Sequence, residues 1–278
     1  MRLKYMGWLW LILLFLAPAA YAQIESESYI RYLPERSAET ISGKVGITQA
    51  ESECAYEYKA FDKLPVKFSL GTQYIGIKNT TAVKLPARLI GLTTDVETTL
   101  PFFRFDKTYL RLGISPSFYA DDWDFPASAF RIPLRSFLIY LPNPQWTFLA
   151  GLAVYPDFER KVLPLLGFIY KPNGKLSFNI IPKRPNINYS LNEKLALFIE
   201  GGAASSEFEV DKGDAKNTVL LYKENRLGLG AKFTPRPNIE SCFSLGGVFN
   251  RTIKYKDSLG KVNIKDGMYI ELRIGIKL

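Results

Sequence analysis

The sequence predicts an all-β fold, a closed antiparallel transmembrane β-barrel, on the strength of three observations. The chain starts like an exported protein, its apolar and polar residues alternate along many segments, and turn-forming phrases separate those segments. Alternation with a period of two is the mark of a strand whose two faces meet different surroundings. The segments are longer than the ~5–6 residues of an average globular strand, which favours a membrane barrel.

The start of the chain predicts export. Arg2 and Lys4 make a basic start, an apolar run covers residues 8–16, and Ala20-Tyr-Ala supplies the small residues that signal peptidase needs. The apolar run is too short for a spanning helix, which needs ~20 residues. The predicted organisation is a signal peptide over 1–22, an irregular segment over 23–40 and an outer-membrane barrel over 41–278.

Composition excludes several functions. The net charge of +9 comes from basic residues that are scattered along the chain, so no nucleic-acid partner is expected. The chain contains no histidine, which removes Ser-His-Asp hydrolysis and His-ligated zinc. We therefore expect a protein that is not an enzyme and has no cofactor.

The clearest strand pattern ends the chain. Apolar residues occupy every second position from Met268 to Leu278, and Glu271 and Arg273 lie among the residues between them. This segment has the length of a membrane-spanning strand, which is ~9–11 residues. The same alternation occurs in residues 88–100, 107–120, 128–140, 219–233 and 239–250.

The polar face of these segments carries charges on strand after strand, as expected for a hydrated barrel interior. One interpretation is a charged constriction that selects solutes, with the arginines favouring anions. The other is a salt-bridge network that fills a narrow barrel, and we favour this second interpretation. The candidate lumen-facing charges are Arg111, Arg131, Arg135, Arg226, Arg273, Glu97, Glu200, Glu224, Glu240 and Glu271.

Two kinds of connection join the segments. Four related phrases begin at Tyr140, Tyr170, Tyr189 and Phe233, and each places Asn, Pro or Gly where a tight turn needs them. We interpret them as short periplasmic turns, each preceded by an aromatic residue that belongs to a girdle at the membrane interface. The longer connections, expected on the outer side, are Asp121–Ala127, Tyr155–Val162, Ser205–Lys216 and Tyr255–Asp266.

The strand count depends on the start of the barrel. Thirteen candidate strands lie between Ser52 and Leu278, and a barrel with both ends in the periplasm needs an even number. A further strand in 41–48 would give 14, whereas excluding 52–59 from the wall would give 12. We expect 12 strands.

Three smaller features carry no site. Cys54 and Cys242 fall on opposite faces of their predicted strands, so we expect no disulfide. The acidic cluster that starts at Asp121 lacks the spacing of a calcium loop and is interpreted as a solvated loop. Gly228 is interpreted as an inner-face residue that makes room within a strand, since no phosphate-binding helix follows it.

The turn phrases at Tyr170 and Tyr189, together with the alternating last strand, resemble an uncharacterised outer-membrane β-barrel family (a domain of unknown function) of diderm bacteria. The resemblance extends over roughly residues 50–278 and implies the fold and the outer-membrane location, but no activity. The last strand is also similar to those that the barrel-assembly machinery recognises, although such strands usually end in Phe and this chain ends in Leu278.

The sequence therefore predicts an outer-membrane barrel of unknown specific role, either a small-solute channel or a structural, surface-interacting barrel. The alternative is a soluble periplasmic β-sandwich or a lipocalin-like binding protein. The expected partners of the barrel are outer-membrane lipid, the barrel-assembly machinery during insertion and small solutes.

Overall fold

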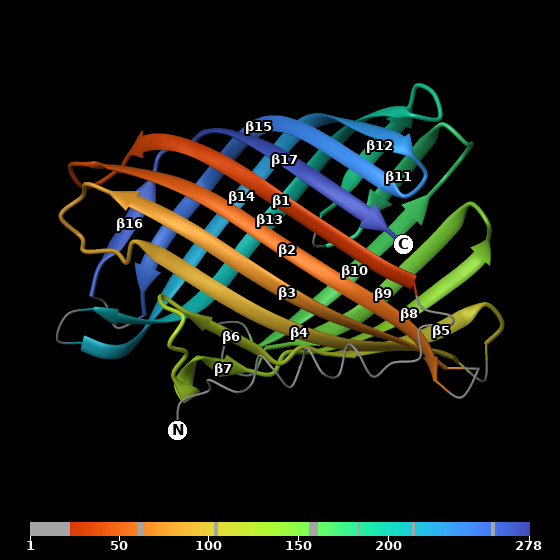
Figure 1. The fold of residues 1–278 in the computed structure, drawn as a ribbon, viewed down its shortest axis with the longest axis horizontal. Helices are drawn as coiled ribbons and strands as arrows, with labels where there is room; N and C mark the ends of the chain where they lie inside the picture. The colour runs from red at the N-terminus through yellow and green to blue at the C-terminus, as the bar shows by residue number, and fades with distance from the viewer. Residues whose placement is uncertain are drawn as a thin grey trace.

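The strands of the computed structural model form one antiparallel sheet that closes on itself as a barrel (Figure 1). The described residues are 23–60, 64–102, 105–155, 161–182, 184–212, 215–256 and 259–278. The predicted signal peptide, 1–22, lies outside them. None of the helical segments within these ranges is long and apolar enough to cross a membrane.

The strands follow one another around the barrel in chain order, with a short 3-10 helix, η2 (Ala127–Ala129), before β7. Their bounds are β1 (Gln23–Ser37), β2 (Lys44–Ala60), β3 (Leu64–Asn79), β4 (Arg88–Pro101), β5 (Thr108–Ile114), β6 (Ser117–Ala120), β7 (Phe130–Arg131), β8 (Leu134–Asn143), β9 (Trp146–Val154), β10 (Val162–Tyr170), β11 (Leu176–Ile180), β12 (Asn186–Ser190), β13 (Leu195–Lys212), β14 (Ala215–Arg236), β15 (Ile239–Tyr255), β16 (Lys261–Ile264) and β17 (Gly267–Lys277).

The wall of the barrel has 14 strands. Three pairs of neighbouring segments, β5 with β6, β7 with β8 and β16 with β17, are single wall strands that a break of two residues interrupts, so the 17 described segments make 14 wall strands. Pro116 and Pro133 lie in two of these breaks, where a residue without an N–H cannot continue the ladder. The expectation of 12 strands was wrong. The alternative count of 14 is right, although residues 41–48 contribute the start of β2 and not a strand of their own.

The wall strand that the sequence did not predict is β1, which closes the barrel by pairing with β17 on one side and with β2 on the other. It occupies most of residues 23–40, which we expected to be irregular. Ser26 and Ser28 lie between apolar residues on one face, and Glu25 and Glu27 lie on the other, so the segment lacks a clear apolar stripe. Residues 52–59 also lie in the wall, as part of β2.

The barrel is taller on one side than on the other. The long strands β13 and β14 have 18 and 22 residues, whereas β11 and β12 have five each. Ser205–Lys216, expected to be an outer loop, lies mostly in β13 and β14, and Tyr255–Asp266 contains β16. In Figure 1, β8 to β12 lie toward the end where the C-terminus is, while the long strands continue beyond them.

The predicted tight turns are confirmed, and three of them share one geometry. The side-chain oxygen of Asn173 accepts hydrogen bonds from the backbone N–H groups of Lys175 and Leu176, at 2.9 and 2.8 Å. Asn143 and Asn192 accept equivalent pairs of bonds in their own turns. An asparagine that bonds the backbone two residues ahead fixes a turn locally. We call this end of the barrel the turn end and the opposite end the loop end.

The outer face of the wall is apolar. Leu272 is 52% exposed and is followed on the same face by Ile274 and Ile276, which are also exposed. At the turn end, aromatic side chains of neighbouring strands lie side by side, and the ring centroids of Trp146 and Tyr170 are 4.1 Å apart. One closed sheet with an apolar exterior disfavours the soluble sandwich or lipocalin-like alternative.

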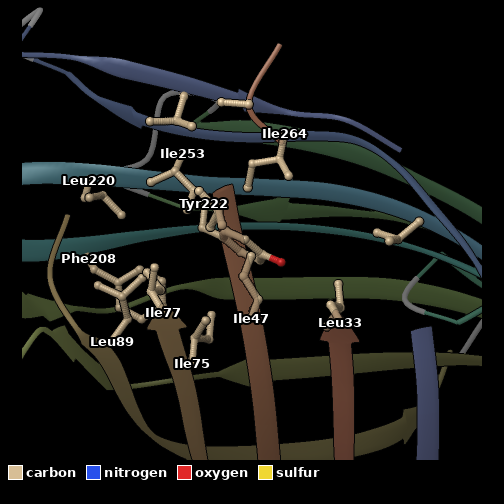
Figure 2. Packing of buried hydrophobic residues seen from close by; sticks show 14 of the residues in the cluster. Leu33, Ile47, Ile75, Ile77, Leu89, Phe208, Leu220, Tyr222, Ile253 and Ile264 are labelled. Carbon is tan, nitrogen blue, oxygen red and sulfur yellow. The ribbon is translucent and has the colours of Figure 1, made fainter. Parts of the chain in front are cut away.

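Apolar side chains fill the interior at the loop end, where a polar lumen was expected (Figure 2). Leu33, Ile47 and Ile77 are adjacent inward residues of β1, β2 and β3, and they pack against Phe208 and Tyr222 from the opposite wall. β13 and β6, which are not neighbours in the wall, approach each other at this end. A parallel bridge between Glu209 and Ala120 joins them. The described side chains therefore close the barrel at its loop end with a hydrophobic core.

Candidate functional site

The interior changes from apolar to charged within one step along β1. Leu33 belongs to the hydrophobic core, whereas Arg31, the previous inward residue, is 1% exposed and surrounded by polar groups. Its Nε donates to Glu271 Oε2 on β17 at 2.8 Å, and its Nη1 donates to Gln49 Oε1 on β2 at 2.5 Å. The same Nη1 lies 3.3 Å from Glu224 Oε1 on β14. Arg31 thus connects its own strand, β1, to β2, β14 and β17.

A second set of hydrogen bonds supports this arrangement. Gln49 donates through Nε2 to the Tyr222 hydroxyl at 2.9 Å, and that hydroxyl donates in turn to Glu224. The ring of Tyr222 lies in the hydrophobic core, so this residue connects the core to the charged layer below it. Buried polar groups cost free energy unless they are hydrogen-bonded, and here each finds a partner.

Arg273 extends the layer along β17 and β13. Its Nη2 lies 2.7 Å from Glu200 Oε2 and 3.1 Å from Glu271 Oε1. Glu200 is itself buried and accepts a hydrogen bond from Ser244 at 3.4 Å. Glu271 is therefore shared by Arg31 and Arg273, so the two arginines form one connected network.

Arg184 enters the same network from the connection between β11 and β12. Its Nη2 lies 3.4 Å from Glu271 Oε1, and its Nη1 lies 3.5 Å from Glu27 Oε1. Because β11 and β12 are short, this connection ends beside the charged layer. We call the connected set the central network; its members are Arg31, Arg184, Arg226, Arg273, Glu27, Glu200, Glu224 and Glu271.

Five of the ten charges selected from the sequence lie in the central network, and the other five do not. Arg135 makes a separate pair of ion contacts, at 2.5 Å to Asp95 and 3.0 Å to Glu97. Nearer the turn end, Glu240 pairs with Lys232 at 3.3 Å. The remaining two are Arg111, which donates to Thr99 Oγ1 at 3.1 Å, and Arg131, which lies 3.6 Å from Glu209.

Sequence reasoning missed Arg31, Glu27 and Arg184. The first two lie in the segment expected to be irregular, and the third lies in a connection between very short strands. The available signal was the spacing of Glu25, Glu27, Tyr29 and Arg31, which is the period of a strand with a polar inner face.

The remaining sequence features lie outside the network. Both cysteines are free, Cys54 exposed and Cys242 buried. Gly228 lies against the Tyr269 hydroxyl on the inner face, so it makes room as expected. Across the described chain, no three Cys, Asp or Glu side chains gather in a way that could hold a metal ion.

The acidic cluster borders a cavity of about 280 Å³ at the loop end, lined by Asp121, Asp211, Arg88 and Tyr255 among others. Burial raises the pKa of Asp121 above its usual value, and the hydrogen bond from the Asp211 N–H, at 3.2 Å, opposes this rise. Asp122 pairs with Arg88 at 2.7 Å. Asp121 and Asp122 are thus held by other residues of the barrel.

Comparison with known proteins supports the resemblance seen in the sequence. Residues 132–269 match the model of a family described as a domain of unknown function (DUF6268). No curated protein sequence matches the chain. The match covers a shorter stretch than the roughly 50–278 over which the sequence resembles a barrel family.

Among solved structures, the chain is similar to an outer membrane channel from Pseudomonas putida F1, with 12% identity and a TM-score of 0.50 over 95% of this chain and 100% of that chain. A mutant of the TodX monoaromatic hydrocarbon channel gives 9% identity and a TM-score of 0.44 over 95% and 91%. The NanC porin gives 10% and 0.41 over 92% and 100%. At such identities the likeness concerns the fold alone, which is that of an outer-membrane barrel.

Proposed function

We propose that this chain is an outer-membrane channel for small solutes. In this conformation its interior side chains close the channel. The signal peptide predicted from the start of the sequence and the apolar exterior of the barrel support the location. The turn end would face the periplasm, and outer-membrane lipid would contact the exterior. We propose no catalytic role, and we expect the barrel-assembly machinery to insert the chain.

The observation that carries the proposal is the contrast between the two halves of one interior. The loop end is filled with apolar residues, whereas the next layer holds four arginines and four glutamates. Five of these eight side chains are buried, namely Arg31, Arg226, Glu200, Glu224 and Glu271. Apolar filling of equal volume is often at least as stable as buried ion pairs. Stability alone therefore does not call for the charges, and charges at membrane depth usually mark a solute or ion pathway.

The pairing of these charges bears on selectivity. Each arginine of the central network has a glutamate within 4 Å, so the layer carries no excess of positive charge. A ring of unpaired arginines would have favoured anions. We accordingly expect weak discrimination between small cations and small anions, in place of the anion preference that the arginines suggested.

A second candidate function is a structural or surface-interacting barrel. The observation in its favour is the hydrophobic core, because a permanently filled loop end leaves no path for a solute. The two candidates make opposite predictions for transport and share every prediction about location.

Two experiments test the proposal. For location, the full chain is expressed in a diderm host, and we expect it in the outer-membrane fraction with heat-modifiable gel migration; recovery from the soluble periplasm would contradict the location. For transport, the purified barrel is reconstituted into liposomes and swelling is measured in isotonic glycine and arabinose. Faster swelling than in protein-free liposomes supports a channel, whereas equal swelling with folded protein supports the structural barrel.

A further inference from the structure

Arg251 is a buried cation whose charge is poorly compensated. It is 1% exposed, and its Nη2 donates to the Lys265 carbonyl oxygen at 2.6 Å. Its Nε and Nη1 have no hydrogen-bond partner in the described structure. A buried donor without a partner costs free energy, and the cost is larger when the group is charged.

A second arginine lies beside it. A Cβ placed on Gly267 would be 2.9 Å from Arg36 Nε and 3.1 Å from Arg251 Nη2, so both guanidinium groups reach the same point above this glycine. Neither arginine makes an ion pair with any described residue. The nearby carboxylate of Glu224 is already engaged by Arg31 and Arg226. Asp266, next to Gly267, also acts electrostatically on Arg251 but forms no ion pair with it in the described structure. Two like charges are thus held together without an ion-pair partner.

The backbone of the two strands that carry these arginines is irregular at this level. In β15, Asn250 has a φ of 53° and forms a bulge, so that Arg251 turns inward where regular alternation would turn it outward. The pairing of β1 shifts between Leu33 and Arg36. Bulges re-aim side chains and are common next to functional sites.

We propose that Arg36 and Arg251 form a binding site for a small oxyanion such as phosphate, which enters from the loop end of the barrel. A guanidinium presents paired N–H donors that match the oxygens of phosphate or carboxylate. Gly267 has no side chain to occupy the space between the two arginines. Arg36 is exposed and could admit the anion, while Arg251 supplies the free donors at the bottom of the site.

The anion could be free in solution or part of a lipid headgroup, since the chemistry is the same. The site opens on the inner face of the barrel, because Gly267 shares its face of β17 with the buried Tyr269. Lipid contacts the opposite face. We therefore assign the site to a soluble oxyanion, and this assignment does not depend on transport.

The test uses the full mature chain, folded in a neutral detergent, and follows its thermal unfolding by heat-modifiable migration. Inorganic phosphate is titrated against sodium chloride of equal ionic strength. We expect phosphate to raise the midpoint, Arg251→Met to abolish the rise, and Arg36→Gln to weaken the apparent affinity about tenfold or more. Arg88→Gln, which changes another exposed arginine at the loop end, should leave the phosphate response unchanged.

Absence of a phosphate-specific rise in the wild type would overturn the site, as would an unchanged rise in Arg36→Gln. This second variant alters an exposed side chain, so it decides the question even where Arg251→Met does not fold. A parallel arm replaces phosphate with phosphatidic acid in the micelles. Stabilisation by that lipid alone, dependent on Arg36, would contradict a site on the inner face.

Discussion

Arg31 Nη1 on β1 and Glu224 Oε1 on β14 lie 3.3 Å apart, although β15 and β17 separate their strands around the wall. The contact therefore runs across the interior and does not follow the sheet. Both side chains are almost completely buried, at 1% and 0% exposure. At this level side chains from different parts of the wall meet, and the lumen is closed.

The first prediction concerns Arg31. Arg31→Met removes one cation that Glu224 and Glu271 share, and leaving buried carboxylates without their partner should lower the free energy of unfolding by about 3–5 kcal/mol. Urea-induced unfolding in lipid vesicles measures this change. The double variant Arg31→Met with Glu271→Gln should recover part of the loss, and a single variant as stable as the wild type would refute the network.

The lipid-facing side of the same strand gives a second prediction. Leu272 is outward and exposed, so Leu272→Arg should destabilise the folded barrel by about 2–4 kcal/mol if the residue lies near the bilayer midplane. The matched control is Leu272→Phe, which keeps the surface apolar and should fold normally. Equal behaviour of the two variants in a vesicle folding assay would show that Leu272 does not face lipid.

Turn chemistry can be tested at Asn173. Asn173→Ala removes two hydrogen bonds to the backbone of its turn and should cost about 1 kcal/mol in unfolding free energy. Lys171→Ala, in the same turn, serves as the control because its exposed side chain makes no such bonds. A neutral Asn173→Ala would mean that the flanking strands alone determine the turn.

Asp121 gives a prediction about pH. Its raised pKa means that the folded barrel binds a proton more tightly than the unfolded chain does, so this residue favours folding at low pH and disfavours it as pH rises through the folded pKa. Asp121→Asn should therefore be more stable than wild type at pH 7, with the difference vanishing below about pH 3. Asp124→Asn, an exposed neighbour, is the control. An advantage that persists in acid would disprove this origin.

The wall of the barrel could largely be predicted from the sequence, because membrane-spanning strands have a simple alternating pattern of apolar and polar residues. Alternation from Met268 to Leu278 identified the outward residues of β17, and asparagine phrases located the tight turns. Both signals are local, since a strand face repeats every second residue and a turn is fixed within a few residues.

The filling of the barrel could not be predicted in the same way. Inward residues near the loop end, such as Leu33 and Ile47, are apolar, and their strands therefore lose the alternation by which lumen faces are recognised. The partners of Arg31 come from β2, β14 and β17, and no local pattern specifies contacts between such distant segments. The bulge at Asn250 likewise reverses the face that simple alternation assigns to Arg251.

The claim that the central network lines a solute pathway is tested most directly by the ion selectivity of single channels in planar bilayers. We expect the wild type to open in brief steps with weak selectivity, Glu224→Gln to shift the reversal potential toward anions, and Arg226→Gln to shift it toward cations, because each variant unbalances the paired charges in one direction. An absence of conductance in folded, heat-modifiable wild type, or identical reversal potentials in both variants, would contradict a pathway through the network.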